Sequence, residues 1–464
     1  MRITTVNPYS QEKLGEYEEY DDNRLNGILS GLKEAQREWE KDIDRRIDYF
    51  RSVLKPNLSK RRNELAKLIT EEMGKPITQS LSEIDKCIKL VDYAINDYPH
   101  YLEPQTIKTE GKKTYVRFDP LGTVLLIMPW NFPLWQVMRG AVPAMLAGNA
   151  IVLKHASIVT GTSLMIEEIF SSELFRSVIV SGSRVGKLIQ KVEGVSLTGS
   201  SGAGKSVAQE AGKHLKKVVL ELGGSDPFIV LKSANICEAS ENAVFARMQN
   251  NGQSCIASKR FIVHEDIFEE FADEIAGKFA NVKVGDPLDK STFLGPLSSM
   301  DQTKTVRSQI ENLAGMGKVS SFGQYSGGIV PPTIAQISGK FEEEVFGPVA
   351  ILTRFRTDQE AIALANDTPF GLGASIWGHS DEAERIVPEI EAGMVFVNKI
   401  VTSDPRVPFG GVKQSGIGRE LSKFGTREFN NVKTWGSLLL KNASEIIWNE
   451  KKFFTIWILQ PFSR

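Results

Sequence analysis

The chain has 464 residues, of which 41% are hydrophobic and 24% charged, and its formal net charge is -1. This length and composition are typical of a globular protein of about two or three domains. A near-zero charge argues against nucleic acid as a partner. Three cysteines and five scattered histidines argue against a disulfide framework and against a zinc site, and the low cysteine content favours the cytoplasm.

The first hundred residues are predicted to be mostly helical. Residues 1–17 lack the apolar core of a signal peptide. Between residues 24 and 98, apolar side chains recur at helical spacing among charged ones. Residues 107–120 then alternate around a glycine, which predicts an extended, hairpin-like arm.

From Val124 onward, short apolar runs alternate with helical segments. The runs "GTVLLIMPW", "NAIVLKHAS" and "PFIVL" show no regular polar alternation, as expected of strands that are buried on both faces. A second set of the same kind extends from Lys259 to Asn398. The predicted fold class is therefore α/β, with two α/β domains and an antiparallel arm.

The C-terminal segment, residues 446–464, is rich in Trp, Phe and Ile. No uninterrupted apolar run reaches the ~20 residues of a membrane-spanning helix, so no membrane partner is expected. The segment could lie at a membrane surface or pack on its own or a neighbouring subunit, and we favour packing.

Residues 195–210, "VSLTGSSGAGKSVAQE", contain the spacing of an ATP-binding loop, from Gly199 to Gly204, Lys205 and Ser206. ATP hydrolysis would also require a metal-binding Asp after another apolar strand, and no apolar run ends in a convincing one. The alternative is that Lys205 and Ser206 occupy the first turn of a helix by chance.

Three short stretches carry side chains suited to acyl transfer. Cys255 in "NNGQSCIASKR" is a candidate thiolate nucleophile among small and polar residues. Glu221 in "LELGGSDP" is a candidate general base, and Asn131 in "MPWNFPLW" is a candidate oxyanion donor in a turn stiffened by prolines. Each stretch alone also has a structural interpretation, as a buried Cys, a solvated Glu and a rigid turn.

Together, the stretches "NPYSQEKLGE", "PWNFP", "AGNAIVLK", "LTGS", "ELGGSDP", "GQSCIA", "EEVFGPV" and "PFGGVKQSGIGRE" resemble the aldehyde dehydrogenase superfamily, in family order, over residues 4–434. The resemblance implies a Rossmann-like cofactor domain (1–102 and 121–223), an α/β catalytic domain (224–430), and an oligomerisation arm with a tail (103–120 and 431–464). It also implies a homodimer or homotetramer. At the substrate level, the resemblance is closest to the succinate-semialdehyde dehydrogenases.

The resemblance implies NAD(P)-dependent oxidation of an aldehyde to an acid through a cysteine thioester, without a metal. Cys255 would attack the aldehyde carbon, and the Asn131 amide with the Cys255 backbone N–H would hold the oxyanion. Glu221 would activate the hydrolytic water. A catalytically silent member of the family is the alternative, and the joint presence of all three residues argues against it.

The resemblance also implies cofactor-binding residues. NADP is expected to be preferred, with NAD used less well, because many NAD-using members have a Glu at the position of Ser157 that would repel a 2′-phosphate. The alternative is that Ser157 is merely permissive. Residues 170–196, near the adenine side, form a shorter segment than usual in the family. The implied residues are Trp130, Lys154, Ser157, Gly199, Ser200, Gly204, Leu222, Glu344 and Phe346.

The implied substrate-binding residues are Arg139, Gln249, Ser403 and Phe409. Arg139 matches a carboxylate-binding Arg of succinate-semialdehyde dehydrogenases, which favours succinate semialdehyde over glyceraldehyde or a longer semialdehyde. Gln249 replaces a second Arg and adds no charge. The alternative is that Arg139 pairs with an internal carboxylate.

Overall fold

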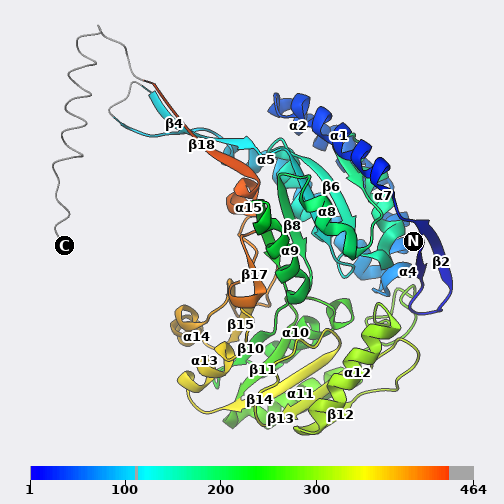
Figure 1. Ribbon diagram of the computed structural model, residues 1–464. Helices are drawn as coiled ribbons and strands as arrows, with labels where there is room; N and C mark the ends of the chain where they lie inside the picture. Colours follow the sequence, from blue (N-terminus) through cyan, green and yellow to red (C-terminus); the bar gives the residue numbers. More distant parts are fainter. Residues whose placement is uncertain (1, 110–112, 438–464) are drawn as a thin grey trace.

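The computed structural model describes residues 2–109 and 113–437. Two sheet-based bodies lie one above the other, and a narrow arm extends from the upper body (Figure 1). Within the described residues, no helix is both long enough and apolar enough to cross a membrane. The prediction for residues 446–464 falls outside the described ranges.

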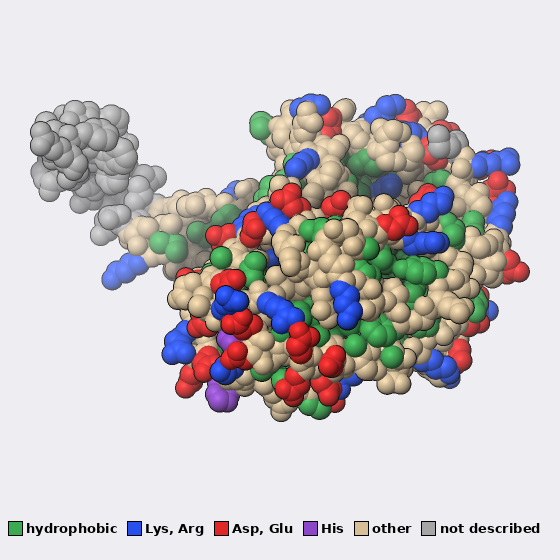
Figure 2. Space-filling model, turned by 90° about the horizontal axis from the view of Figure 1, so that it is seen from below, with side chains coloured by type: hydrophobic (Ala, Val, Ile, Leu, Met, Phe, Trp, Pro, Cys, Tyr) green, Lys and Arg blue, Asp and Glu red, His purple; other side chains and the backbone are tan. Residues whose placement is uncertain are grey.

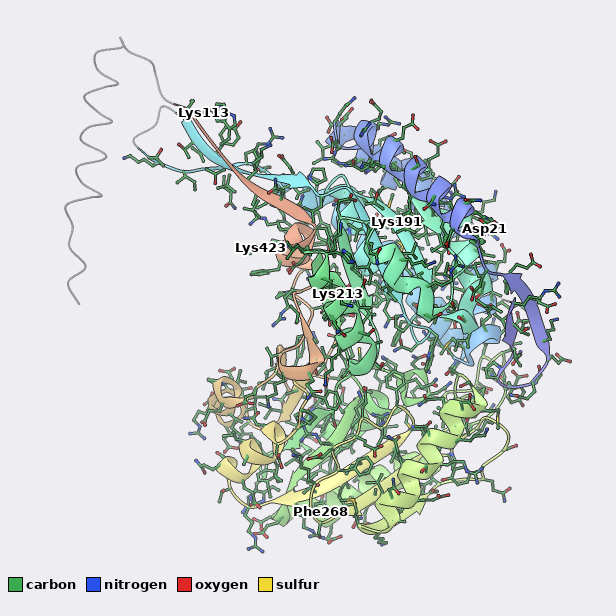
Figure 3. All side chains as sticks on the ribbon, viewed as in Figure 1. Asp21, Lys113, Lys191, Lys213, Phe268 and Lys423 are labelled. Atoms are coloured by element: carbon green, nitrogen blue, oxygen red, sulfur yellow. The ribbon has the colours of Figure 1, made fainter. Side chains whose placement is uncertain are left out.

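The N-terminal region is a hairpin followed by helices, as predicted for residues 24–98. The side chain of Asp21 accepts a hydrogen bond from the backbone N–H of Arg24 at 2.7 Å, and this N-cap begins the first helix (Figure 3). Leu25, Leu32 and Trp39 are buried on one face of that helix. The elements are β1 (Arg2–Val6), β2 (Lys13–Glu18), α1 (Asp22–Trp39), α2 (Ile43–Tyr49), α3 (Lys55–Lys60), α4 (Arg62–Met73) and α5 (Ile77–Tyr101).

The upper sheet has six strands in the order β17-β9-β8-β5-β6-β7. Every neighbouring pair is parallel except β17 with β9. The strands are β5 (Thr123–Met128), β6 (Ala150–His155), β7 (Phe175–Ser177), β8 (Gly194–Thr198), β9 (Lys217–Glu221) and β17 (Gly416–Ile417). The helices that connect them are α6 (Trp135–Leu146), α7 (Thr160–Phe170), α8 (Val185–Ile189) and α9 (Ser201–Lys213).

The lower sheet has seven strands in the order β12-β13-β14-β11-β10-β15-β16, with only the edge strand β12 antiparallel. The strands are β10 (Asp226–Val230), β11 (Ser258–His264), β12 (Gly317–Ser321), β13 (Thr333–Ile337), β14 (Val349–Phe355), β15 (Gly373–Trp377) and β16 (Met394–Val397). Its helices are α10 (Ile236–Met248), α11 (Phe268–Ala280), α12 (Met300–Ala314), α13 (Asp358–Asn366) and α14 (Ser380–Ile386). Two mainly parallel sheets confirm the predicted α/β class.

The arm is a three-stranded antiparallel sheet of β3 (Gln105–Thr106), β4 (Lys113–Pro120) and β18 (Asn430–Ser437), which follows α15 (Ser422–Glu428). Tyr115 and Trp435 stack across it with ring centroids 5.0 Å apart. The predicted antiparallel arm is thereby confirmed.

The predicted domain boundaries stay a prediction, and one strand departs from them. The range 224–430 was assigned to the catalytic domain, yet β17 within it pairs with β9 of the upper sheet. Gly416 makes this possible, since its φ of 149° and bare Cα let the strand approach Leu220 and Glu221 closely.

Charged side chains of both signs are interspersed on the face shown in Figure 2. This pattern agrees with the near-zero net charge of the chain.

Candidate active site

A hollow of about 270 Å³ lies where loops from both bodies meet. The ends of β5, β8 and β9 face it, as expected for a ligand site at the carboxyl ends of parallel strands. Its lining brings together eight predicted site residues: Trp130, Asn131, Gly199, Ser200, Leu222, Cys255, Glu344 and Phe346. Motifs spread along the sequence therefore meet at one place.

Cys255 lies in the turn before β11, and the buried ammonium of Lys259 binds the backbone of this turn. The Lys259 ammonium donates to the carbonyls of Ser254 and Cys255 at 2.8 and 2.6 Å, and pairs with the Glu344 carboxylate at 3.1 Å. Burial raises the pKa of the Cys255 thiol to about 12, and the charges of Arg139 and Lys259 oppose this rise. Lys259 was not predicted, although it lies within the quoted "GQSCIASKR".

Asn131 lies in the turn after β5, with its amide fixed at both ends. Its Nδ2 donates to the carbonyl of Gln253, and its Oδ1 accepts from Gln136, both at 3.0 Å. An amide nitrogen carries two hydrogens, so one N–H stays available to an oxyanion on Cys255.

Glu221 ends β9 and is 2% exposed. Among the described residues, neither carboxylate oxygen has a hydrogen-bond partner. Burial raises the pKa of this carboxyl well above its usual range, and the nearby Glu420 carboxylate raises it further, while Arg139 and Arg419 oppose them. A raised pKa makes this carboxylate a stronger base than a solvated Glu.

Arg139 is not placed as the substrate prediction expected. Its guanidinium is 2% exposed, forms an ion pair with Glu420, and lies 4.2 Å above the Phe409 ring. The structure therefore has the internal ion pair that was the alternative interpretation. The spacing along α6 could not reveal a partner contributed by the distant "GIGRE" stretch.

The other predicted substrate-binding residues do not line the hollow that contains Cys255. Phe409 is buried beneath Arg139 and exchanges backbone hydrogen bonds with Glu420 at 2.8 Å. Ser403 accepts a hydrogen bond from Lys86 at 2.5 Å. Gln249 is half-buried at the end of α10. Their roles in substrate binding stay predictions.

The remaining cofactor candidates lie along the upper sheet. Lys154 is the last residue but one of β6, and Ser157 follows the strand. Both are half-buried, and burial lowers the pKa of Lys154. Gly204 packs under Leu222, because a Cβ added to it would lie 2.5 Å from a Leu222 methyl. Gly199 and Ser200 line the hollow immediately before α9. Backbone N–H groups at a helix N-terminus can bind phosphate, so this part of the hollow suits the phosphates of a dinucleotide.

The two residues that completed the ATP-loop pattern do not line this hollow. Lys205 is exposed and donates to Gln414 at 3.3 Å, and Ser206 is also exposed. Lys205 and Ser206, which complete the ATP-loop pattern, are ordinary residues of the first turns of α9.

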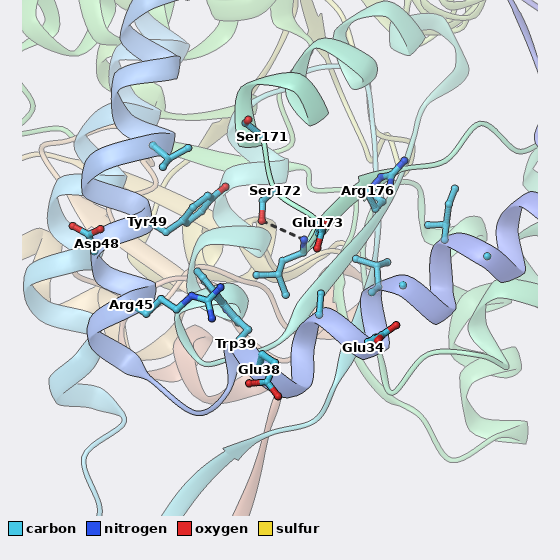
Figure 4. A pocket seen from close by; sticks show the side chains of 17 residues that line it. Glu34, Glu38, Trp39, Arg45, Asp48, Tyr49, Ser171, Ser172, Glu173 and Arg176 are labelled. Atoms are coloured by element: carbon cyan, nitrogen blue, oxygen red, sulfur yellow. Dashed lines mark hydrogen bonds between the residues drawn. The ribbon is translucent and has the colours of Figure 1, made fainter.

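Figure 4 shows another hollow, of about 910 Å³, whose lining includes none of Cys255, Glu221 and Asn131. It lies between α1, α2 and residues 171–176, at the start of the segment predicted to be shorter than usual. Its aromatic donors are satisfied, since Trp39 donates to Met145 at 2.7 Å and Tyr49 to Phe170 at 2.5 Å. These contacts are typical of structural side chains.

Comparison with known proteins agrees with this geometry. The aldehyde dehydrogenase family matches residues 1–435, and the chain belongs to that family. It is 40% identical to a probable NADP(+) succinate-semialdehyde dehydrogenase of Synechocystis sp., over 94% of this chain and 99% of the relative. It is 39% identical to succinate-semialdehyde dehydrogenase [NADP(+)] 1 of Mycobacterium tuberculosis, over 94% and 99%.

Solved structures give the same result. The succinic semialdehyde dehydrogenase of Streptococcus pyogenes in complex with NADP+ superposes with a TM-score of 0.90 at 34% identity, covering 93% of this chain and 99% of that one. The structure of Gox0499 also has a TM-score of 0.90 at 34% identity, covering 94% and 99%.

Proposed function

We propose that this aldehyde dehydrogenase oxidises succinate semialdehyde to succinate with NADP as the preferred cofactor. The observation that carries the proposal is the convergence of Cys255, Asn131 and Glu344 on one hollow, together with the names of the relatives above. The hollow brings a free thiol and a fixed amide together, and Glu221, buried at the end of β9, supplies a carboxyl. These are the groups that acyl transfer to water requires.

The first half of the reaction centres on Cys255. Its thiolate adds to the aldehyde carbon, and the resulting oxyanion accepts the free N–H of Asn131 and the backbone N–H of Cys255. Collapse of this adduct expels a hydride and leaves an acyl thioester. Uptake of that hydride is the chemistry that a bound nicotinamide cofactor supplies.

The second half centres on Glu221. Its carboxylate takes a proton from water, whose oxygen attacks the thioester carbon and releases the acid and the Cys255 thiolate. Because burial raises the pKa of Glu221, the carboxyl is well matched to accept and hold this proton.

The preference for NADP rests on Ser157 and Lys154. A hydroxyl donor and an ammonium suit a 2′-phosphate, whereas a Glu at position 157 would repel it. The relatives named for NADP support the same preference.

We also propose that the chain forms a homodimer or homotetramer in the cytoplasm, through the arm of β3, β4 and β18. Support comes from the arm's exposed apolar side chains, Val432 and Trp435, which a second copy could cover.

The test is a panel of aldehydes assayed with NAD and with NADP, on the purified full chain. Succinate semialdehyde with NADP should give the highest kcat/KM, ahead of butyraldehyde, glyceraldehyde and longer semialdehydes. A kcat/KM for butyraldehyde equal to that for succinate semialdehyde would refute the substrate assignment.

A further inference from the structure

Lys86 of α5 is a half-buried cation to which the reaction above gives no role. Its ammonium donates to the Ser403 hydroxyl at 2.5 Å and lies 4.1 Å from the centroid of the Trp135 ring. No carboxylate within 4.0 Å pairs with it among the described residues. Lys75, Lys259 and Arg139, by contrast, each pair with a Glu.

Two further hydrogen-bond donors belong to the same cluster. Ser403 accepts from Lys86, so its own O–H can still donate. Trp135 is 4% exposed, and its indole N–H is buried without a hydrogen-bond partner in the described part of the chain. A buried donor left unpaired is unfavourable, so this N–H is well suited to an acceptor that a ligand brings.

This cluster is close to the reacting groups. Trp135 begins α6, four residues after Asn131. The next residue, Gln136, lines the hollow beside Cys255 and donates to the Asn131 amide at 3.0 Å. Glu83, three residues before Lys86 on α5, accepts the backbone N–H of Trp135 at 2.8 Å. Succinate semialdehyde is short, with two methylene groups between its aldehyde and its carboxylate.

We propose that Lys86 and the Trp135 indole N–H bind the distal carboxylate of the substrate, beside Ser403, which the resemblance already implies in substrate binding. The cluster offers one charge and two neutral donors, and a carboxylate has about four lone-pair sites to accept them. Arg139, whose charge is already paired with Glu420, is then a neighbour that shapes the site. This inference rests on the proposed oxidation of a semialdehyde.

The experiment compares kcat/KM for succinate semialdehyde and butyraldehyde in wild type, Lys86→Met and Lys86→Arg. Lys86→Met should lower the ratio of the two values about 10- to 100-fold, the equivalent of one charged hydrogen bond. Lys86→Arg should restore part of the ratio. Lys89→Met, on the exposed side of the same helix, is the matched control and should keep the wild-type ratio.

An unchanged ratio in Lys86→Met would overturn the assignment of Lys86. If the wild type itself shows no preference for succinate semialdehyde, the proposed function fails instead, so the two failures are distinguishable. Should Lys86→Met not fold, Ser403→Ala and Trp135→Phe each remove one donor, and each should lower the ratio several-fold. Wild-type ratios in both would equally overturn the proposal.

Discussion

At the scale of single residues, the active site is organised by buried cations, each with a different set of acceptors. The Lys259 ammonium donates to the backbone carbonyls of Ser254 and Cys255 and forms an ion pair with Glu344. It thereby links Cys255, the proposed nucleophile, to Glu344, which the resemblance implies in ribose binding. Within residues 2–109 and 113–437, the recorded partners of the Lys86 ammonium are the Ser403 hydroxyl and the Trp135 ring.

Lys259→Met is expected to make the Cys255 thiol less reactive. Loss of the cation removes a charge that holds the thiol pKa down, so the thiolate fraction below the pKa should fall. We expect the rate of alkylation by iodoacetamide to drop roughly three- to tenfold, since one pKa unit is a factor of ten. Lys290→Met, an exposed control, should react like wild type, and an equal rate in Lys259→Met would exclude this electrostatic role.

Glu221→Gln should separate the two halves of the reaction. Gln cannot take the proton of the hydrolytic water, so thioester hydrolysis should slow by about 10²- to 10⁴-fold, as for loss of a general base. Rapid mixing should show a burst of about one reduced cofactor per active site, followed by slow turnover. Wild-type steady-state rates without a burst would remove Glu221 from this role.

The affinity for succinate semialdehyde should depend on the protonation of Lys86. Burial and the charge of Arg139 lower the pKa of Lys86 to about 8, while Cys87, Glu83 and Asp404 act in the opposite direction. The ammonium is present below this pKa and is lost above it. The KM for succinate semialdehyde should therefore rise through this range while that for butyraldehyde changes less. Parallel pH profiles for both aldehydes would contradict this.

At the scale of elements, the turn that carries Asn131 is held by α5. The start of α6 has no side-chain cap of its own, and Glu83 of α5 accepts the N–H groups of Leu134 and Trp135 at 2.9 and 2.8 Å. Glu83 in turn pairs with the fully buried Lys75. The buried Lys75–Glu83 ion pair thus fixes the N-terminus of α6. Gln136 in the first turn of α6 in turn donates to the Asn131 amide.

Ser157→Glu tests the loop between β6 and α7. The new carboxylate should repel the 2′-phosphate of NADP and accept the ribose hydroxyls of NAD. We expect the ratio of kcat/KM for NADP over NAD to fall about 10- to 100-fold, on the scale of a charge-assisted contact. Ser30→Glu, exposed on α1, adds the same charge elsewhere and should leave the ratio intact. An unmoved ratio in Ser157→Glu would mean that Ser157 is permissive only.

At the scale of the whole molecule, the sequence predicted what local patterns encode. Apolar runs without alternation gave both parallel sheets, and the quoted motifs gave Cys255, Asn131 and the residues beside them. Pairs between distant segments were not predictable, because no local pattern marks them. Arg139 with Glu420, Lys86 with Ser403, and β17 with β9 are all of this kind.

The central claim is that one thiol converts an aldehyde to an acid, and the most direct test follows both products in Cys255→Ala. Wild-type protein supplied with succinate semialdehyde and NADP should form NADPH and succinate in equal amounts. Cys255→Ala should form neither, while still binding NADP with nearly wild-type affinity. Full turnover in Cys255→Ala, or NADPH without succinate in the wild type, would contradict the account.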